Sequence, residues 1–153
     1  MQPSDLIFVS RSLLELRRKG KPRQADLNRA LSTAYFAMFH ALCRNCADCL
    51  VGKNKLSRSE LAWIQAYRAV EHGFARNQCR NRTTMEKFPE EIRDFASNFV
   101  DLQEKRHLAD YDPSYRFTRN EVLTWIEGAE TTIKKLQTSQ IEDRKAFAVW
   151  TAM

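Results

Sequence analysis

Apolar residues recur at the three- and four-residue spacing of α-helices along most of the chain. Ser4 and Asp5 are suitable residues for a helix start, and the apolar positions that follow them predict a helix over about residues 5–18. No glycine or proline interrupts residues 23–50, and residues 30–43 are apolar on nearly every side. This pattern predicts a long helix that is buried on most of its surface.

A third helix is predicted after the turn at residues 51–54, which contains a glycine. Either Ser57 or Ser59 can cap its start, and its apolar positions extend to Val70. The polar residues 76–84 that follow are expected to form a loop.

Two further helices are predicted in the second half of the chain. Pro89 is followed by two glutamates, which suits the first turn of a helix that we expect to reach about Ala109. Thr118 and Glu121 have the spacing of a capping box at the start of a fifth helix, whose apolar stripe extends to Leu136.

No segment alternates apolar and polar residues as a strand does, and no internal repeat is present. The sequence therefore predicts an all-α fold, an up-down bundle of about five helices over residues 1–138. Residues 139–153 are expected to form a C-terminal tail with a short helix.

The composition is that of a globular protein. A length of 153 residues fits one domain, and 43% apolar and 29% charged residues with only four Gly and four Pro exclude collagen-like and disordered chains. The longest apolar run, residues 34–39, is far too short to cross a bilayer, and residues 2–5 do not resemble the start of a signal peptide. We therefore expect a cytoplasmic protein with no membrane contact.

The net charge of +6 is unevenly distributed along the chain. Residues 1–85 contain fifteen Lys and Arg against six Asp and Glu, whereas residues 86–153 contain ten against thirteen. Arg outnumbers Lys sixteen to nine, which suits recognition of phosphate groups. This asymmetry favours a polyanionic partner on one face of the protein.

Two segments of the sequence indicate a function more specifically than the composition does. Residues 29–42 read Arg-Ala-Leu-Ser-Thr-Ala-Tyr-Phe-Ala-Met-Phe-His-Ala-Leu, and residues 106–113 read Arg-His-Leu-Ala-Asp-Tyr-Asp-Pro. Together, and in this order, they resemble motifs of the HEPN superfamily, and the resemblance covers about residues 5–137. It implies a homodimer of HEPN-like helical bundles that binds or cleaves RNA in a toxin-antitoxin or defence system.

The resemblance also implies a site at the end of the fourth helix. Nuclease members of the superfamily place an arginine, a short spacer and a histidine there. Arg106 matches the arginine, but Tyr111 stands where the histidine is expected, and His107 directly follows Arg106. Two functions stay open, a metal-independent endoribonuclease and a degenerate ribonuclease that binds RNA.

The side chains of residues 106–111 have chemistry that suits the binding of a phosphate and a base. Arg106 and Asp110 are four residues apart and share a helix face, which predicts an ion pair, and Arg106 can also hold a phosphate. His107 can exchange a proton near neutral pH. Tyr111 is a poor base but a good hydrogen-bond donor and stacking surface. These four residues are the candidate catalytic group, and they fit binding better than turnover.

Three polar residues interrupt the apolar helix, and they are candidates for binding or support: Arg29, Thr33 and His40. A buried Arg29 would need a partner, for which Asp110 and Asp112 are candidates. His40 is expected to be a hydrogen-bonded core imidazole. His72 is expected at the surface.

The cysteines do not form a convincing metal site. Cys43, Cys46 and Cys49 are spaced like the start of an iron-sulfur motif, but they lie on a continuous predicted helix without glycine or proline, and Cys79 is thirty residues away. We expect reduced thiols that fill the core or an interface. No metal and no cofactor is expected, since the usual phosphate-loop, dinucleotide, zincin and calcium-loop motifs are absent.

Two alternatives to RNA binding stay open. The first is a non-enzymatic scaffold that pairs with a partner protein, such as an antitoxin or a minimal nucleotidyltransferase. The second is a small-nucleotide binder that uses the same cleft. The aromatic residues of the predicted helices are expected to form the core, with some of them at a homodimer seam near the end of the fourth helix.

Overall fold

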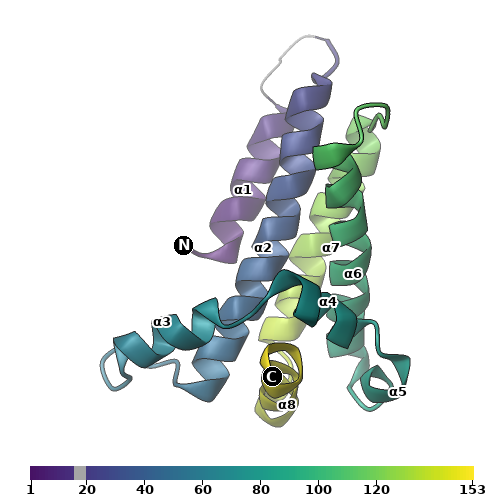
Figure 1. Cartoon of the computed structure of the whole chain (residues 1–153). Coiled ribbons are helices and arrows are strands. Elements are labelled where there is room, and N and C mark those ends of the chain that lie inside the picture. Colours follow the sequence, from purple (N-terminus) through teal and green to yellow (C-terminus); the bar gives the residue numbers. More distant parts are fainter. Residues whose placement is uncertain (16–19) are drawn as a thin grey trace.

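The computed structural model describes residues 1–15 and 20–153, which form eight helices and no strand (Figure 1). The predicted all-α class is confirmed. The helices are α1 (Pro3–Leu14), α2 (Gln24–Leu50), α3 (Glu60–Arg68), α4 (His72–Cys79), α5 (Arg82–Met85), α6 (Glu90–Tyr111), α7 (Arg119–Gln137) and α8 (Ile141–Ala152). The end of the predicted first helix, residues 16–18, and the basic residues at 17–19 lie outside the described ranges.

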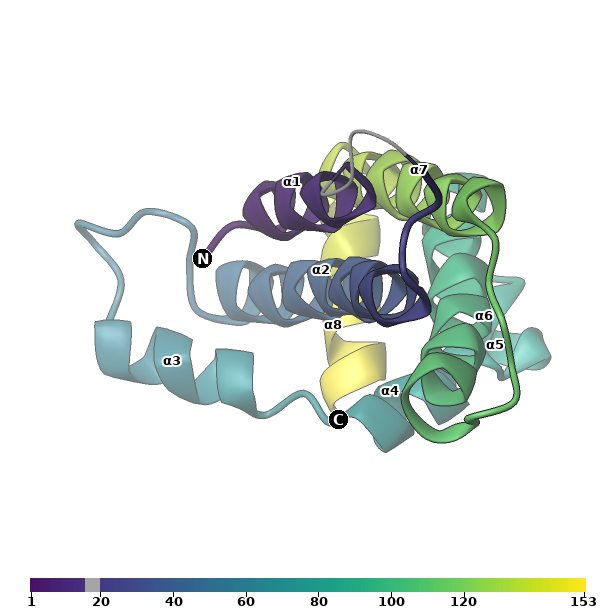
Figure 2. The same cartoon turned by 90° about the horizontal axis from the view of Figure 1, so that it is seen from above.

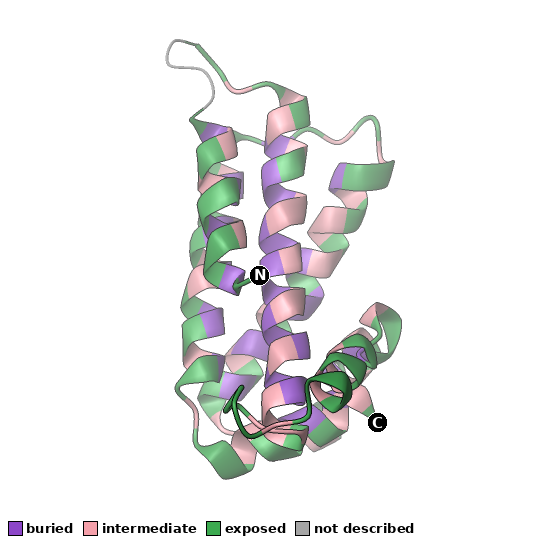
Figure 3. Cartoon of the chain, turned by 90° about the vertical axis from the view of Figure 1, so that its left-hand side faces the viewer, coloured by how far each residue is buried: buried purple, intermediate pink, exposed green. Residues whose placement is uncertain are grey.

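Helix α2 is the centre of the molecule and contacts α1, α3, α6, α7 and α8. Buried residues follow its length (Figure 3), and small residues on it let the neighbouring helices approach closely. The alanines of α2 with at most 4% exposure are Ala30, Ala34, Ala37, Ala41 and Ala47. Between these alanines the larger side chains of Leu31, Tyr35, Met38 and Leu42 fill the core.

Helix α8 belongs to the same core. It crosses the lower end of α2 (Figures 1 and 2) and buries Phe147 and Ala148 completely. Asn45 Nδ2 on α2 donates to the Arg144 carbonyl at 3.2 Å, and Trp150 Nε1 donates to the Gln78 carbonyl at 2.9 Å. The C-terminal tail is therefore packed against both α2 and α4.

The loop predicted over residues 76–84 was wrong, because this segment contains the end of α4 and the start of α5. Ala75 and Cys79, one helical turn apart, are buried, and so is Met85. Asn81 caps α5 by accepting a hydrogen bond from the Thr84 amide at 3.2 Å. A few buried side chains and one cap thus order a stretch that is otherwise polar.

The predicted serine cap of α3 and threonine cap of α7 are present. Ser59 Oγ accepts from the Ala62 amide at 3.2 Å at the start of α3. Thr118 Oγ1 accepts from the Glu121 amide at 3.1 Å at the start of α7. The predicted capping box of α7 is only half formed, because the Glu121 carboxylate accepts from the Tyr115 hydroxyl at 3.4 Å instead of from the Thr118 amide. No helix within residues 1–15 and 20–153 is long and apolar enough to cross a membrane.

Candidate functional site

A pocket of about 370 Å³ lies between α4 and the last turns of α6. Arg76 on α4 lines one side of it. The residues that line it from α6 are Gln103, Glu104, Arg106, His107 and Leu108. Two arginines from helices far apart in the sequence therefore face one pocket.

The structure brings the predicted catalytic group together at the end of α6. Arg106 Nε lies 2.9 Å from Asp110 Oδ2, so the predicted ion pair between these residues is present. The rings of His107 and Tyr111 are 4.9 Å apart. Arg106 and His107 line the pocket, whereas Asp110 and Tyr111 support them from the following turn.

Aromatic rings of α2 hold the Arg106 side chain in place. Its guanidinium carbon lies 5.3 Å from the ring centre of Tyr35 and 5.1 Å from that of Phe36. Cation–π contacts of this kind favour a fixed position of the charge. Arg106 is therefore oriented by rings on one side and by the Asp110 carboxylate on the other.

The pocket residues retain unused hydrogen-bonding capacity. Arg76 Nη2 pairs with Glu104 Oε1 at 3.3 Å, but its Nε has no hydrogen-bond partner among the described residues. The same holds for Gln103 Oε1, and for Arg106 Nε, whose N–H is not directed at the Asp110 oxygen beside it. Buried polar atoms without partners cost about 1–3 kcal/mol each, and they are uncommon unless a ligand or water serves them.

His72 is part of this region, although we expected it at the surface. It is half-buried, its Nδ1 lies 2.6 Å from the Tyr35 hydroxyl, and its ring stacks on Phe39 at 3.6 Å. Burial, with the charges of Arg106 and His40, lowers its pKa below the usual range for histidine. Near neutral pH His72 is therefore an uncharged imidazole beside the Arg106 guanidinium.

His40 joins α2 to α3. Its Nδ1 is hydrogen-bonded to the Tyr67 hydroxyl, and its ring is half-buried rather than in the core. Burial, followed by the positive N-terminus, lowers its pKa. His40 therefore supports the attachment of α3 and does not line the pocket.

Arg29 and Thr33 lie away from the pocket. Arg29 is exposed, and among the described residues no carboxylate pairs with it. Thr33 Oγ1 donates to the Arg29 carbonyl at 2.7 Å within the same helix. The expected tie between Arg29 and Asp110 or Asp112 was wrong, because Asp110 pairs with Arg106 and Asp112 accepts from Ser114.

The cysteines fill space in the protein interior. Cys43, Cys46 and Cys79 are buried, and Cys49 is half-buried. Burial raises the pKa of Cys43 and Cys79 to about 12 and that of Cys46 to about 11. In the part of the chain that the structure describes, no group of three or more His, Cys, Asp or Glu residues could hold a metal ion.

Acidification is expected to destabilise the protein through His40 and His72. Their pKa values are lower in the folded state than the value of about 6.5 in an unfolded chain. Their contribution to stability is therefore complete above about pH 6.5 and is lost as the pH falls toward the folded pKa values. Urea unfolding measured from about pH 7.5 to about pH 5 should show a falling free energy of unfolding.

The matched variants identify the source of that pH dependence. The double variant H40Q/H72Q should flatten it, whereas H107Q, at an exposed histidine of α6, should retain it. An unchanged pH dependence in H40Q/H72Q would contradict the prediction.

Comparisons with protein-family models, with curated proteins and with solved structures found no match to this chain. The class of protein is therefore described from its fold and its site alone. It is an all-helical protein with an arginine-lined pocket between α4 and α6. The resemblance to HEPN proteins stays a prediction.

Proposed function

We propose that this protein binds RNA and that the pocket between α4 and α6 holds a phosphate group. The observation that carries the proposal is the convergence of Arg76 and Arg106 on one pocket. Arginine forms forked, charge-assisted hydrogen bonds to phosphate oxygens. The Nε group of Arg76, which has no hydrogen-bond partner among the described residues, provides a further donor.

The surroundings of the pocket suit a single-stranded ligand. Tyr111 is 66% exposed, and its ring lies beside that of His107 at the pocket. Exposed aromatic rings next to cationic groups provide surfaces on which bases stack. A base of the bound strand is therefore expected to lie on Tyr111 while its phosphate is held by Arg106.

Charge also supports a polyanionic ligand. The segment that contains α4 and α5 carries three arginines, Arg76, Arg80 and Arg82. It has no acidic residue between Glu71 and Glu86. This segment belongs to the basic part of the chain, and it packs beside the pocket. Attraction between such a segment and a phosphate backbone accelerates association.

The proposed activity is binding rather than rapid cleavage. Transfer of the RNA 2′-hydroxyl proton needs a base, and the phenol of Tyr111 is a poor one at neutral pH. The resemblance of residues 29–42 and 106–113 to HEPN proteins supports the RNA ligand. It also supports a homodimer in a toxin-antitoxin or defence system.

Replacing Arg106 with Gln is expected to weaken the binding of a short single-stranded RNA by about fivefold to tenfold. Loss of one phosphate contact should also reduce the slope of log affinity against log salt by about 0.7. Fluorescence anisotropy over a salt series measures both quantities, and circular dichroism checks that the helical content is unchanged.

Arg116→Gln is the matched control, because it removes the same charge from an exposed arginine outside the pocket. It should change the affinity by less than about twofold, because Arg116 does not line the pocket and exposed charges are screened by salt. Equal affinity and equal salt slope for wild type and R106Q would show that the pocket holds no phosphate. Undetectable RNA binding by the wild type would remove the proposed function.

A scaffold for a partner protein is the second candidate function, and α3 favours it. This helix has no buried residue, and it stands to one side of the bundle (Figure 1). Leu61 and Ile64 on it are 79% and 41% exposed. Exposed apolar side chains on one helix are typical of a surface that binds another protein, such as a nucleotidyltransferase or an antitoxin.

A further inference from the structure

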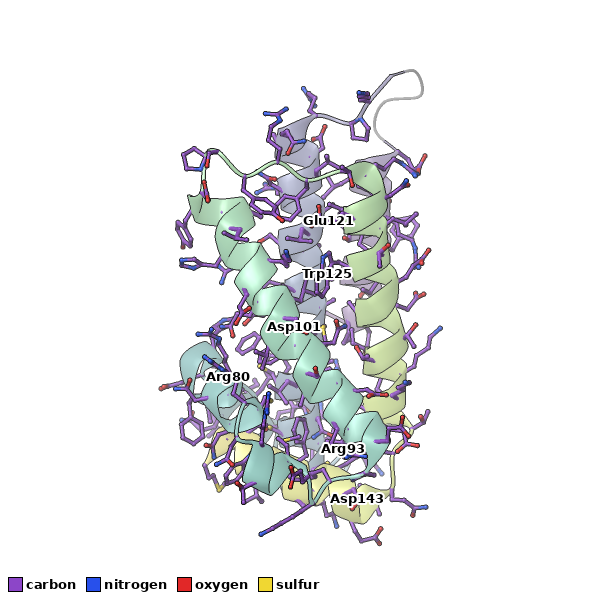
Figure 4. All side chains as sticks on the ribbon, turned by 90° about the vertical axis from the view of Figure 1, so that its right-hand side faces the viewer. Arg80, Arg93, Asp101, Glu121, Trp125 and Asp143 are labelled. Carbon is purple, nitrogen blue, oxygen red and sulfur yellow. The ribbon has the colours of Figure 1, made fainter. Side chains whose placement is uncertain are left out.

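A second pocket, of about 470 Å³, lies on the other part of the seam between α4, α5 and α6. Three arginines line it: Arg80 directly after α4, Arg82 on α5 and Arg93 on α6. Figure 4 looks onto this face, with Arg80 on one side of α6 and Arg93 near its start. The pocket is thus bordered by positive charges from three separate elements.

The three guanidinium groups have no partner within the described residues. None of them takes part in an ion pair there, in contrast to Arg76 and Arg106 at the first pocket. All three are exposed, so their side chains are free to converge. Like charges around one pocket repel each other, and an anion bound among them would relieve this repulsion.

The rest of the pocket is suited to the body of a nucleoside. Its apolar wall consists of buried side chains that include Met85, Ala96 and Val100. Glu86 and Asp101 also line the pocket, and neither lies within ion-pair distance of its arginines. Carboxylates accept hydrogen bonds from hydroxyl groups, as they do from ribose in dinucleotide sites.

We propose that this pocket binds a nucleoside phosphate, with the phosphate held by Arg80, Arg82 and Arg93. The apolar wall at Met85 and Val100 contacts the base or the sugar, and Asp101 accepts a ribose hydroxyl. This site is separate from the pocket of Arg76 and Arg106. Binding of a free nucleotide to it does not depend on the proposed RNA function, whereas binding of one residue of an RNA strand rests on that function. The nucleoside phosphate comes either from a free nucleotide or from one residue of a bound RNA.

The test uses the triple variant R80Q/R82Q/R93Q of the full chain. ATP, GTP, CTP and UTP are titrated separately by isothermal titration calorimetry, and a short single-stranded RNA is titrated by anisotropy. At least one of these ligands should bind the wild type, and the triple variant should bind it at least about tenfold more weakly. Adenosine, which has no phosphate, should compete at least about tenfold more weakly than ATP.

The matched control is R29Q/R68Q/R116Q, which removes the same charge from three exposed arginines outside this pocket. It should change the affinity by less than about twofold. Since all six arginines are exposed, both variants should keep the thermal midpoint of the wild type.

The separate titrations of free nucleotides and of RNA identify the source of the nucleotide. Weaker binding of a free nucleotide with unchanged RNA binding assigns the pocket to free nucleotides. Weaker RNA binding assigns it to one residue of an RNA strand, even if no free nucleotide binds. The proposal is overturned if R80Q/R82Q/R93Q binds every ligand as the wild type does, if the control variant loses as much affinity, or if no ligand binds the wild type.

Discussion

Deletion of residues 141–153 is expected to abolish cooperative folding, because it removes α8 from the core. Phe147 on α8 is completely buried, and its ring packs against Phe88 at 5.6 Å and against Phe95 at 6.1 Å. Loss of one buried phenylalanine costs about 3–5 kcal/mol, and the deletion also exposes the surface of α2 that α8 covers. Domains are stable by only about 5–15 kcal/mol, so this loss should leave most of the chain unfolded.

A milder pair of variants on the same helix keeps this prediction testable if the deleted chain aggregates. Phe147→Ala should lower the free energy of unfolding by about 3–5 kcal/mol in urea denaturation. Val149→Ala, two residues further along on the exposed side, should change it by less than about 1 kcal/mol. A deletion variant that keeps the wild-type unfolding midpoint would contradict the packing of α8.

Phe99→Ala on α6 is expected to be strongly destabilising. Phe99 is completely buried, and its ring stacks at 5.5 Å on Tyr35 and at 6.2 Å on Phe95. The substitution removes these contacts and leaves a cavity beneath the candidate site. The free energy of unfolding should fall by about 3–5 kcal/mol, measured by urea denaturation followed by circular dichroism.

Phe8→Ala is the control for that substitution, because the same side chain is removed from a position that is 73% exposed. Its free energy of unfolding should stay within about 0.5 kcal/mol of the wild type. If both phenylalanine variants lost equal stability, the stacked rings of α2 and α6 would not be the centre of the core.

The long helices could be predicted because their sequence patterns are local. The segment from Gln24 to Leu50 has no helix-breaking residue, and α2 occupies all of it. The start of α7 was also predictable, since the Thr118 side chain binds an amide only three residues away. In both cases the interactions that define the element lie within a few residues of each other.

Helices α4 and α5 could not be predicted in this way. Their apolar positions are few. Ala75 and Cys79 are buried where α4 packs on α6 and α8, and Met85 is buried beside α6. The four-residue spacing of Ala75 and Cys79 was a weak signal of a helix in this polar stretch. Short helices of this kind depend on partners that the local sequence does not reveal.

At the candidate site, too, local interactions could be predicted from the sequence and long-range contacts could not. The ion pair of Arg106 and Asp110 follows from their spacing on one helix, and it is present. The contact between Tyr35 and His72 joins residues 37 positions apart, and no local pattern predicts it. The four-residue spacing of His72 and Arg76 could have placed both on one helix face beside the pocket, had α4 been recognised.

The burial of the cysteines has a consequence for how this protein responds to oxidants and alkylating reagents. These reagents attack accessible thiolates, whereas Cys43 and Cys46 are enclosed in the core and stay protonated. Their sulfur atoms become reactive only when the helices around them separate. The chain thus carries two natural reporters of global opening, Cys43 and Cys46, which record unfolding events without an introduced label.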